Sequence, residues 1–169
     1  MSAPVSTDTF RIRPSTAKDS ALILGFIREL ADYEKMAFEV TATEKDIRTQ
    51  LFGEHPRAEC VLAELDSKAI GFALYFHNFS TFLAKPGLYL EDLFIRREFR
   101  GRGYGRKLLS HLARLALARG CGRFEWAVLD WNEPAIRFYQ SLGARILDDW
   151  RINRVSGSAL EKLAGEARD

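Results

Sequence analysis

The stretch Arg100-Gly-Arg-Gly-Tyr-Gly-Arg106 is the part of the chain from which the rest is best interpreted. Its glycines, Gly101, Gly103 and Gly105, stand at alternate positions, so that consecutive backbone N–H groups can turn toward one anion. A leucine-rich amphipathic pattern follows directly, and the start of a helix adds partial positive charge at the same place. Four cations crowd this loop: Arg100, Arg102, Arg106 and Lys107. The pattern predicts a site for a diphosphate.

Other interpretations of this loop differ in how well they fit its spacing. A Walker A loop needs Gly-x-x-x-x-Gly-Lys-Ser/Thr, which does not occur in the chain. A dinucleotide fingerprint needs Gly-x-Gly-x-x-Gly directly after a strand, whereas here the spacing is Gly-x-Gly-x-Gly and charged residues come first. A nucleic-acid module using the Arg96–Lys107 cluster stays open, as does a glycine-rich turn with no ligand.

Hydrophobic periodicity around the loop predicts an α/β fold. The expected order is β-α-α-β-β-β-α-β-α-β, and the strand–loop–helix–strand segment implies parallel pairing beside antiparallel hairpins. We expect a flexible tail over residues 1–8 and one domain over residues 9–169. The expected strands cover residues 10–13, 59–65, 69–79, 87–95, 124–129 and 144–155, the last as one strand or two. The expected helices cover residues 23–30, 43–51, 108–116, 132–142 and 158–167, and the third of them ends at Gly120 and Gly122.

Composition narrows the class of protein. The formal net charge of the 169 residues is only +2, which does not suggest a polyanionic partner. Two cysteines and three histidines are scattered without metal-ligand spacing, so no metal is expected. The first residues lack the pattern of a secretion signal, and no apolar run approaches the roughly 20 residues of a membrane span. We expect a cytoplasmic protein without a membrane partner.

Two adjacent carboxylates, Glu91 and Asp92, lie within an apolar strand. Strict alternation would put Asp92 on one face with Leu88, Leu90 and Phe94, and Glu91 on the other. At least one carboxylate is then removed from water, which raises its pKa and makes it a better base. The alternative is a carboxylate at a strand end that faces water or pairs with an arginine.

The loop and its flanks resemble the GCN5-related N-acetyltransferase (GNAT) superfamily. Within it, the segments Tyr89-Leu-Glu-Asp92, Asn132-Glu-Pro-Ala135 and Phe138-Tyr-x-x-x-Gly143 are similar to the spermidine/spermine, or thialysine, branch. The resemblance implies a GNAT fold with a mixed, mostly antiparallel sheet and a splayed parallel pair at the cofactor site. It also implies direct transfer of an acetyl group from acetyl-CoA to a small primary amine in a ternary complex. A catalytically silent acyl-CoA sensor remains an alternative.

The resemblance also implies roles for individual residues. Glu91 would pass the amine's proton to water, and Tyr139 would protonate the coenzyme A thiolate. Tyr33, Glu34, Glu91 and Asp92 would bind the amine. The residues expected to bind the cofactor are Leu93, Phe94, Ile95, Arg100, Gly101, Arg102, Gly103, Tyr104, Gly105, Arg106, Asn132 and Ala135. Taken alone, Tyr139 is typical of a core residue and Asn132 of a helix cap.

The sequence says less about which amine accepts the acetyl group. Polyamine-acetylating members carry an acidic residue and a tryptophan in the segment that here reads Phe79-Ser-Thr-Phe-Leu-Ala-Lys85, which has neither. This segment, with Ala127-Val-Leu-Asp-Trp-Asn132, is more similar to members that acetylate thialysine. Asp148 and Asp149 are alternatives for a late acidic position. The resemblance further implies a homodimer, formed through the last strands and the C-terminal segment.

Overall fold

The computed structural model describes residues 9–167, so the expected tail over residues 1–8 lies outside the described residues. The chain divides after Ala127 into two compact units, each described by itself below.

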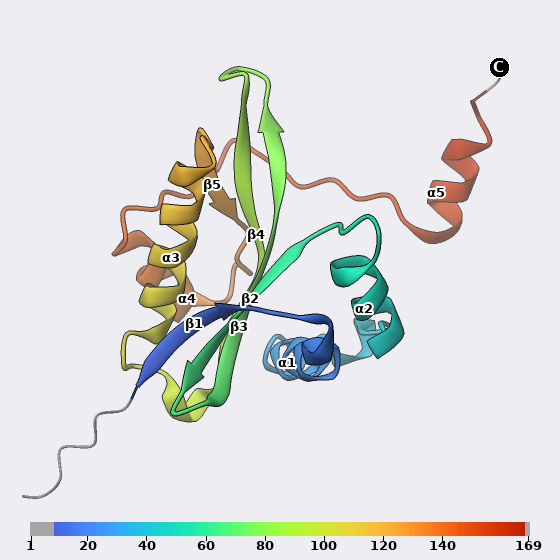
Figure 1. The fold of residues 1–169 in the computed structure, drawn as a ribbon. Coiled ribbons are helices and arrows are strands. Elements are labelled where there is room, and N and C mark those ends of the chain that lie inside the picture. Colours follow the sequence, from blue (N-terminus) through green and yellow to red (C-terminus); the bar gives the residue numbers. More distant parts are fainter. Residues whose placement is uncertain (1–8, 168–169) are drawn as a thin grey trace, which may run out of the picture. The chain divides into compact units, whose positions relative to one another are not determined.

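The first unit is built on a five-stranded sheet with strand order β1-β2-β3-β4-β5 (Figure 1). The first four strands pair antiparallel, and β4 pairs with β5 in parallel. The strands are β1 (Phe10–Pro14), β2 (Glu59–Leu65), β3 (Lys68–Ser80), β4 (Lys85–Ile95) and β5 (Arg123–Trp126). The predicted mixed, mostly antiparallel sheet with one parallel pair is confirmed.

Helices cover both faces of this sheet (Figure 1). On one face lie α1 (Ser20–Tyr33) and α2 (Glu44–Phe52), and on the other lies α3 (Tyr104–Ala118). Three aromatic rings centre the core beneath α1, with Phe26 stacked on Phe72 at 5.6 Å and tilted against Phe94 at 6.2 Å. Short 3₁₀ turns at Ala17–Asp19, Ala37–Glu39 and Arg97–Phe99 connect these elements.

Local sequence explains where these elements begin and turn. Thr43 and Asp46 form a reciprocal capping box at the start of α2, as their spacing predicts. The β2–β3 hairpin turns through Asp66 and Ser67, both with positive φ, which matches the twist of the flanking strands. No helix in the described part of the chain is long and apolar enough to cross a membrane.

The second unit contains α4 (Glu133–Gln140) and α5 (Gly157–Ala164). The predicted helices here are confirmed, but the strand or strands predicted over residues 144–155 are wrong, because that segment has no strand. A strand requires a neighbour that pairs with its backbone groups, and this unit supplies none among its described residues. The apolar side chains that produced the prediction, Ile146, Trp150 and Ile152 among them, are exposed instead.

Candidate active site

The glycine loop connects β4 to α3 through two residues with left-handed backbone conformation. Gly101 has φ +76° and Gly103, the residue before α3, has φ +81°. A Cβ at either position would meet no atom within 4 Å, so their backbone angles favour glycine there and crowding does not. The loop therefore presents bare backbone at the N-terminus of a fifteen-residue helix, as an anion site requires.

Two side chains of the loop point into the protein. Tyr104 is buried, with its ring stacked on Phe10 at 4.7 Å, so it packs in the core and offers a ligand only its backbone. Arg100 turns back toward β4, where its Nε donates to the Ile95 carbonyl at 2.7 Å. Its guanidinium lies 4.5 Å from the ring centre of Tyr33 and 5.3 Å from that of Phe94. Arg100 thus connects the predicted cofactor loop to the predicted acceptor residue Tyr33, a contact that no sequence pattern signals.

The strand β4 is paired on both sides only in its first part. β5 pairs with Gly87–Leu90 and ends there, so within residues 9–167 the segment Glu91–Ile95 has a neighbour only in β3. The backbone N–H of Arg96 donates to Ile70 of β3 at 2.9 Å. Because backbone groups alternate sides along a strand, Phe94 faces β3, whereas Leu93 and Ile95 face the side that β5 leaves open. An extended ligand can pair with those two residues.

A β-bulge lies at the predicted carboxylate pair. Leu90 pairs with Tyr75 and Asp92 with Leu74, so Glu91 is the extra residue. Paired residues share a face, and adjacent residues of β3 face opposite sides. Asp92 and Leu90 therefore lie on opposite faces, and the prediction that they share one is wrong. The bulge turns Asp92 toward the α1 face, where Leu74 packs.

Three carboxylates gather at this point. Asp92 is half-buried, and burial, followed by repulsion from Glu91 and Glu34, raises its pKa to about 7. Burial also raises the pKa of Glu34. Glu91 itself is exposed. Glu91 and Glu34 lie close enough to Asp92 to act on it electrostatically. The structure therefore brings these three predicted acceptor residues together.

The end of α1 holds Glu34 in place. Lys35 adopts φ +61°, and the N–H of Met36 donates to the Ala31 carbonyl at 2.8 Å, which closes the helix after Tyr33. Arg96 braces α1 against the strand end, since its guanidinium forms an ion pair with Glu29 at 2.7 Å. This ion pair joins α1, the helix before Glu34, to the residue that follows β4.

The remaining predicted residues belong to the second unit. Asn132 is buried and caps α4, its Oδ1 accepting from the Ala135 N–H at 3.4 Å. Tyr139 lies half-buried beside Phe138, with ring centres 5.4 Å apart. Asp148 and Asp149 are exposed. Within residues 9–167, no group of three or more histidine, cysteine or acidic residues is arranged to hold a metal ion.

Comparisons with known proteins identify the family to which these residues belong. Residues 27–144 match the model of the acetyltransferase (GNAT) family. A thialysine N-epsilon-acetyltransferase of Sus scrofa is 39% identical over 92% of this chain and 97% of its own. An L-ornithine N5-acetyltransferase of Arabidopsis thaliana is 31% identical over 90% and 87%. A solved structure, an integron cassette protein from the mobile metagenome of V. cholerae, superposes with a TM-score of 0.78 at 30% identity, over 92% of this chain and 97% of its own.

The family model covers most of the chain, and the curated relatives align over nearly its full length. Acetyl-CoA is the general donor of the family, and the names of these two enzymes describe acetyl transfer to amines. The chain therefore belongs to the GNAT family of acetyltransferases and is an amine N-acetyltransferase.

Proposed function

We propose that the protein transfers an acetyl group from acetyl-CoA to a small primary amine that carries a second charged group, such as thialysine, a diamine or a polyamine. The carboxylate cluster of Glu34, Glu91 and Asp92 is the single observation that carries this proposal. A partly buried acidic cluster is unfavourable alone and is stabilised by a cationic ligand. Relatives named for thialysine and ornithine, both amino acids with a side-chain amine, support the same substrate class.

Acetyl-CoA, the acetyl donor, would be held mainly by backbone groups of the protein. The N–H groups of the Gly101–Gly105 loop would bind the pyrophosphate, with Arg102 and Arg106 as exposed cations beside it. Leu93 and Ile95 would pair with the amides of the pantetheine arm as a neighbouring strand does. Because Arg100 already occupies the Ile95 carbonyl, we expect that residue to contribute mainly its N–H. Asn132 and Ala135 are assigned to the same arm because they match the family motif.

The acceptor would be held and deprotonated by carboxylates. Only the neutral amine attacks a thioester, and an alkyl ammonium has a pKa of about 10.4. Glu91 is exposed to water, so we assign it the transfer of that proton through water. Asp92 and Glu34 would bind the charged groups of the acceptor, with Tyr33 beside them. Tyr139 is assigned the proton delivered to the thiolate because it matches the family motif.

We also propose a domain organisation, a location and an oligomeric state. We propose one functional domain over residues 9–169, acting in the cytoplasm as a homodimer without nucleic-acid or membrane partners. Support for the dimer comes from exposed apolar side chains in the second unit, since a second copy can cover them. These are Ile146, Leu147, Trp150, Ile152, Val155, Leu160 and Leu163. Native mass measurement tests this part, and a monomer at micromolar concentration contradicts it.

The experiment that tests the activity is thiol release from acetyl-CoA with a panel of amines: thialysine, ornithine, putrescine, spermidine and an uncharged monoamine. We expect turnover with amines that carry a second charge and little with the monoamine. Thermal stabilisation by coenzyme A, measured in parallel, separates the outcomes. Stabilisation without turnover of any amine would indicate a silent sensor, and a preference for the monoamine would refute the acceptor class.

A further inference from the structure

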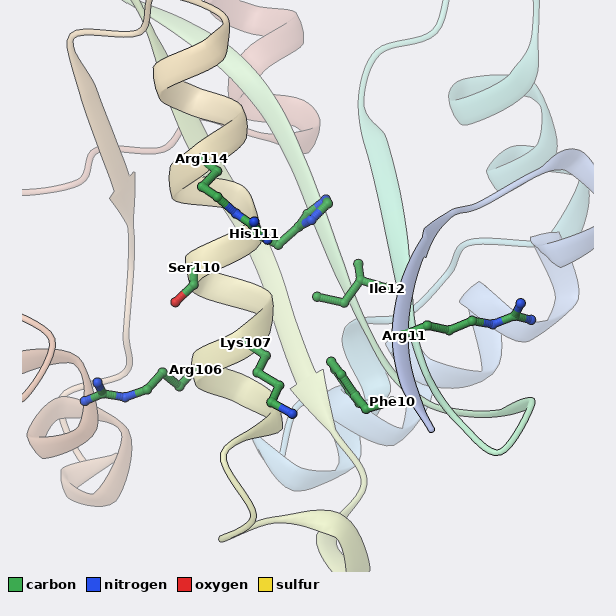
Figure 2. A pocket seen from close by; sticks show the side chains of 8 residues that line it. All are labelled: Phe10, Arg11, Ile12, Arg106, Lys107, Ser110, His111 and Arg114. Atoms are coloured by element: carbon green, nitrogen blue, oxygen red, sulfur yellow. The ribbon is translucent and has the colours of Figure 1, made fainter. Parts of the chain in front are cut away.

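A groove of about 460 Å³ runs between β1 and α3, within the first unit (Figure 2). Phe10 and Ile12 point from β1 toward α3, and Lys107 and His111 lie opposite them. Arg114 follows one turn further along the helix. The side chains of Arg11 and Arg106, which also border the groove, point away from it. Among the residues that the structure describes, no carboxylate lines the groove.

The positive charges of this groove are not balanced within the described residues. α3 contains no acidic residue over Tyr104–Ala118. Lys107, His111 and Arg114 form no ion pair in the described part of the chain, and the Lys107 ammonium lies 4.9 Å from the ring centre of Phe10. Burial, followed by repulsion from Arg114, lowers the pKa of His111. His111 therefore carries little charge at neutral pH, and an anionic partner would meet the charges of Lys107 and Arg114.

Several other cations of this unit form ion pairs. Arg13 pairs with Glu64 and Asp19, and Arg119 pairs with Glu59. Arg11, which borders the same groove, lies opposite Glu64 of β2 and forms an ion pair with it at 2.6 Å. Lys107 and Arg114 differ from these cations because they have no ion pair within the described residues, and with His111 between them they form a stripe along one side of the groove.

Among the described strands, β1 lies at an edge of the sheet, and the same groove runs along it. The Ser15 N–H donates to Cys60, and the Thr9 carbonyl accepts from Asp66, so the odd-numbered residues of this segment face β2. By alternation, the N–H and C=O groups of Phe10 and Ile12 face outward, away from the sheet. Those outward groups can pair with one more strand.

We propose that β1 and the Lys107–Arg114 stripe together bind an extended acidic peptide, which adds to the sheet as an outer strand. Its backbone would pair with Phe10 and Ile12, and its acidic side chains on the α3 face would reach the stripe. Lys107 and Arg114 lie about 10.5 Å apart along α3, and side chains on one face of a strand repeat about every 6.6 Å, so two or three successive acidic side chains span the stripe. A second copy of this chain does not fit, because it would bring the same positive charges together.

The test uses a fluorescein-labelled heptapeptide, Thr-Glu-Val-Glu-Val-Glu-Thr with blocked ends, and fluorescence anisotropy at about 50 mM salt, where surface charge is weakly screened. We expect saturable binding that weakens at least about tenfold in Arg114→Glu. The matched control is Arg28→Glu, an equal charge change at an exposed position of α1 on the opposite face of the sheet. Its affinity should stay within twofold, and acetyl transfer should be unchanged in both variants.

Backbone pairing is tested on the peptide, which leaves the protein unaltered. N-methylation removes peptide donors without changing charge, and only alternate residues of a paired strand face β1. Methylating one alternate set should abolish binding, and methylating the other should leave it nearly intact. No binding at 1 mM peptide, equal effects of Arg114→Glu and Arg28→Glu, or equal effects of the two methylated sets would each overturn the proposal. Displacement of the peptide by a tighter-binding oligothymidylate would overturn it in favour of a nucleic-acid surface.

Discussion

Both halves of β4 pair with β3 on one side, but only the first half also pairs with β5 on the other. Residues Gly87–Leu90 pair with β3 and β5, and Leu88 and Leu90 are almost fully buried. Residues Glu91–Ile95 pair with β3 alone in the described part of the chain, and they carry two carboxylates and an open row of backbone groups. The bulge at Glu91 separates the halves. One strand thus holds the sheet together with its first half and offers binding groups with its second.

The largest expected effect follows from removing the carboxylate at the bulge. Glu91→Gln keeps the shape of the side chain but cannot accept a proton, so kcat should fall by on the order of 100-fold, the usual contribution of a general base. Steady-state kinetics with thialysine measures this. The matched change in the doubly paired region is Glu125→Gln on β5, which should leave kcat nearly unchanged. Equal kcat values for Glu91→Gln and the unaltered protein would remove Glu91 from catalysis.

The next largest effect is expected at the glycine loop, which follows the second half of β4. Gly103→Asp places a carboxylate where the pyrophosphate is expected, so coenzyme A should bind roughly 100-fold more weakly, about 2.7 kcal/mol. Thermal shift with coenzyme A measures the loss. Gly120→Asp is the control, because its φ of +70° and its open surroundings match those of Gly103 at the other end of α3. If both variants keep the same coenzyme A shift, the loop does not bind the phosphates.

Asp92 should affect acceptor binding and pH dependence together. Asp92→Asn removes a charge facing the acceptor, so KM for a cationic amine should rise about tenfold at pH 8, typical of one lost charged hydrogen bond. In the unaltered protein KM should fall as pH rises through about 7, because Asp92 ionises there. The variant should lose this dependence. A KM profile that is the same in both proteins would place Asp92 outside the acceptor site.

The same pKa predicts a change in stability. Because the pKa of Asp92 is about 7 in the folded protein and about 3.9 in an unfolded chain, folding takes up a proton between these values. The free energy of unfolding therefore falls as pH rises through this window. Asp92→Asn should be the more stable protein at pH 8, by on the order of 2 kcal/mol, and the difference should vanish below about pH 4. Urea denaturation at both pH values measures it.

Arg100 should give the smallest effect. Arg100→Lys keeps the positive charge but loses the bond to the Ile95 carbonyl and the planar contact with Tyr33. KM for the amine should rise roughly three- to fivefold while coenzyme A affinity stays within twofold. Arg102→Lys, an exposed neighbour in the same loop, should leave KM for the amine unchanged. A loss of coenzyme A affinity in Arg100→Lys alone would show that Arg100 serves the phosphates.

Much of this arrangement could be predicted from the sequence, because it depends on local patterns. Alternating glycines before an amphipathic helix predicted the loop, and Thr43 with Asp46 predicted the start of α2. The bulge at Glu91 could not be predicted, since it depends on pairing with Leu74 and Tyr75 of another strand. The direction of the Arg100 side chain depends on tertiary contacts in the same way.

The error in the second unit has a related cause. Residues 144–155 contain the alternating apolar side chains of a strand, but a strand forms only beside a partner strand. Periodicity reports which side chains require burial and does not identify what covers them. The apolar side chains of this segment were therefore recognised correctly, but its secondary structure was predicted wrongly.

Amide hydrogen exchange along β4, measured by NMR with and without coenzyme A, tests the central claim most directly. In the free protein the Leu93 and Ile95 amides should exchange quickly, because they face the open side, while Phe94 and Leu88 should be protected by pairing. Coenzyme A should slow exchange at Leu93 and Ile95 and leave Leu88 unchanged. If binding protects neither Leu93 nor Ile95, the open half of β4 is not where the donor lies.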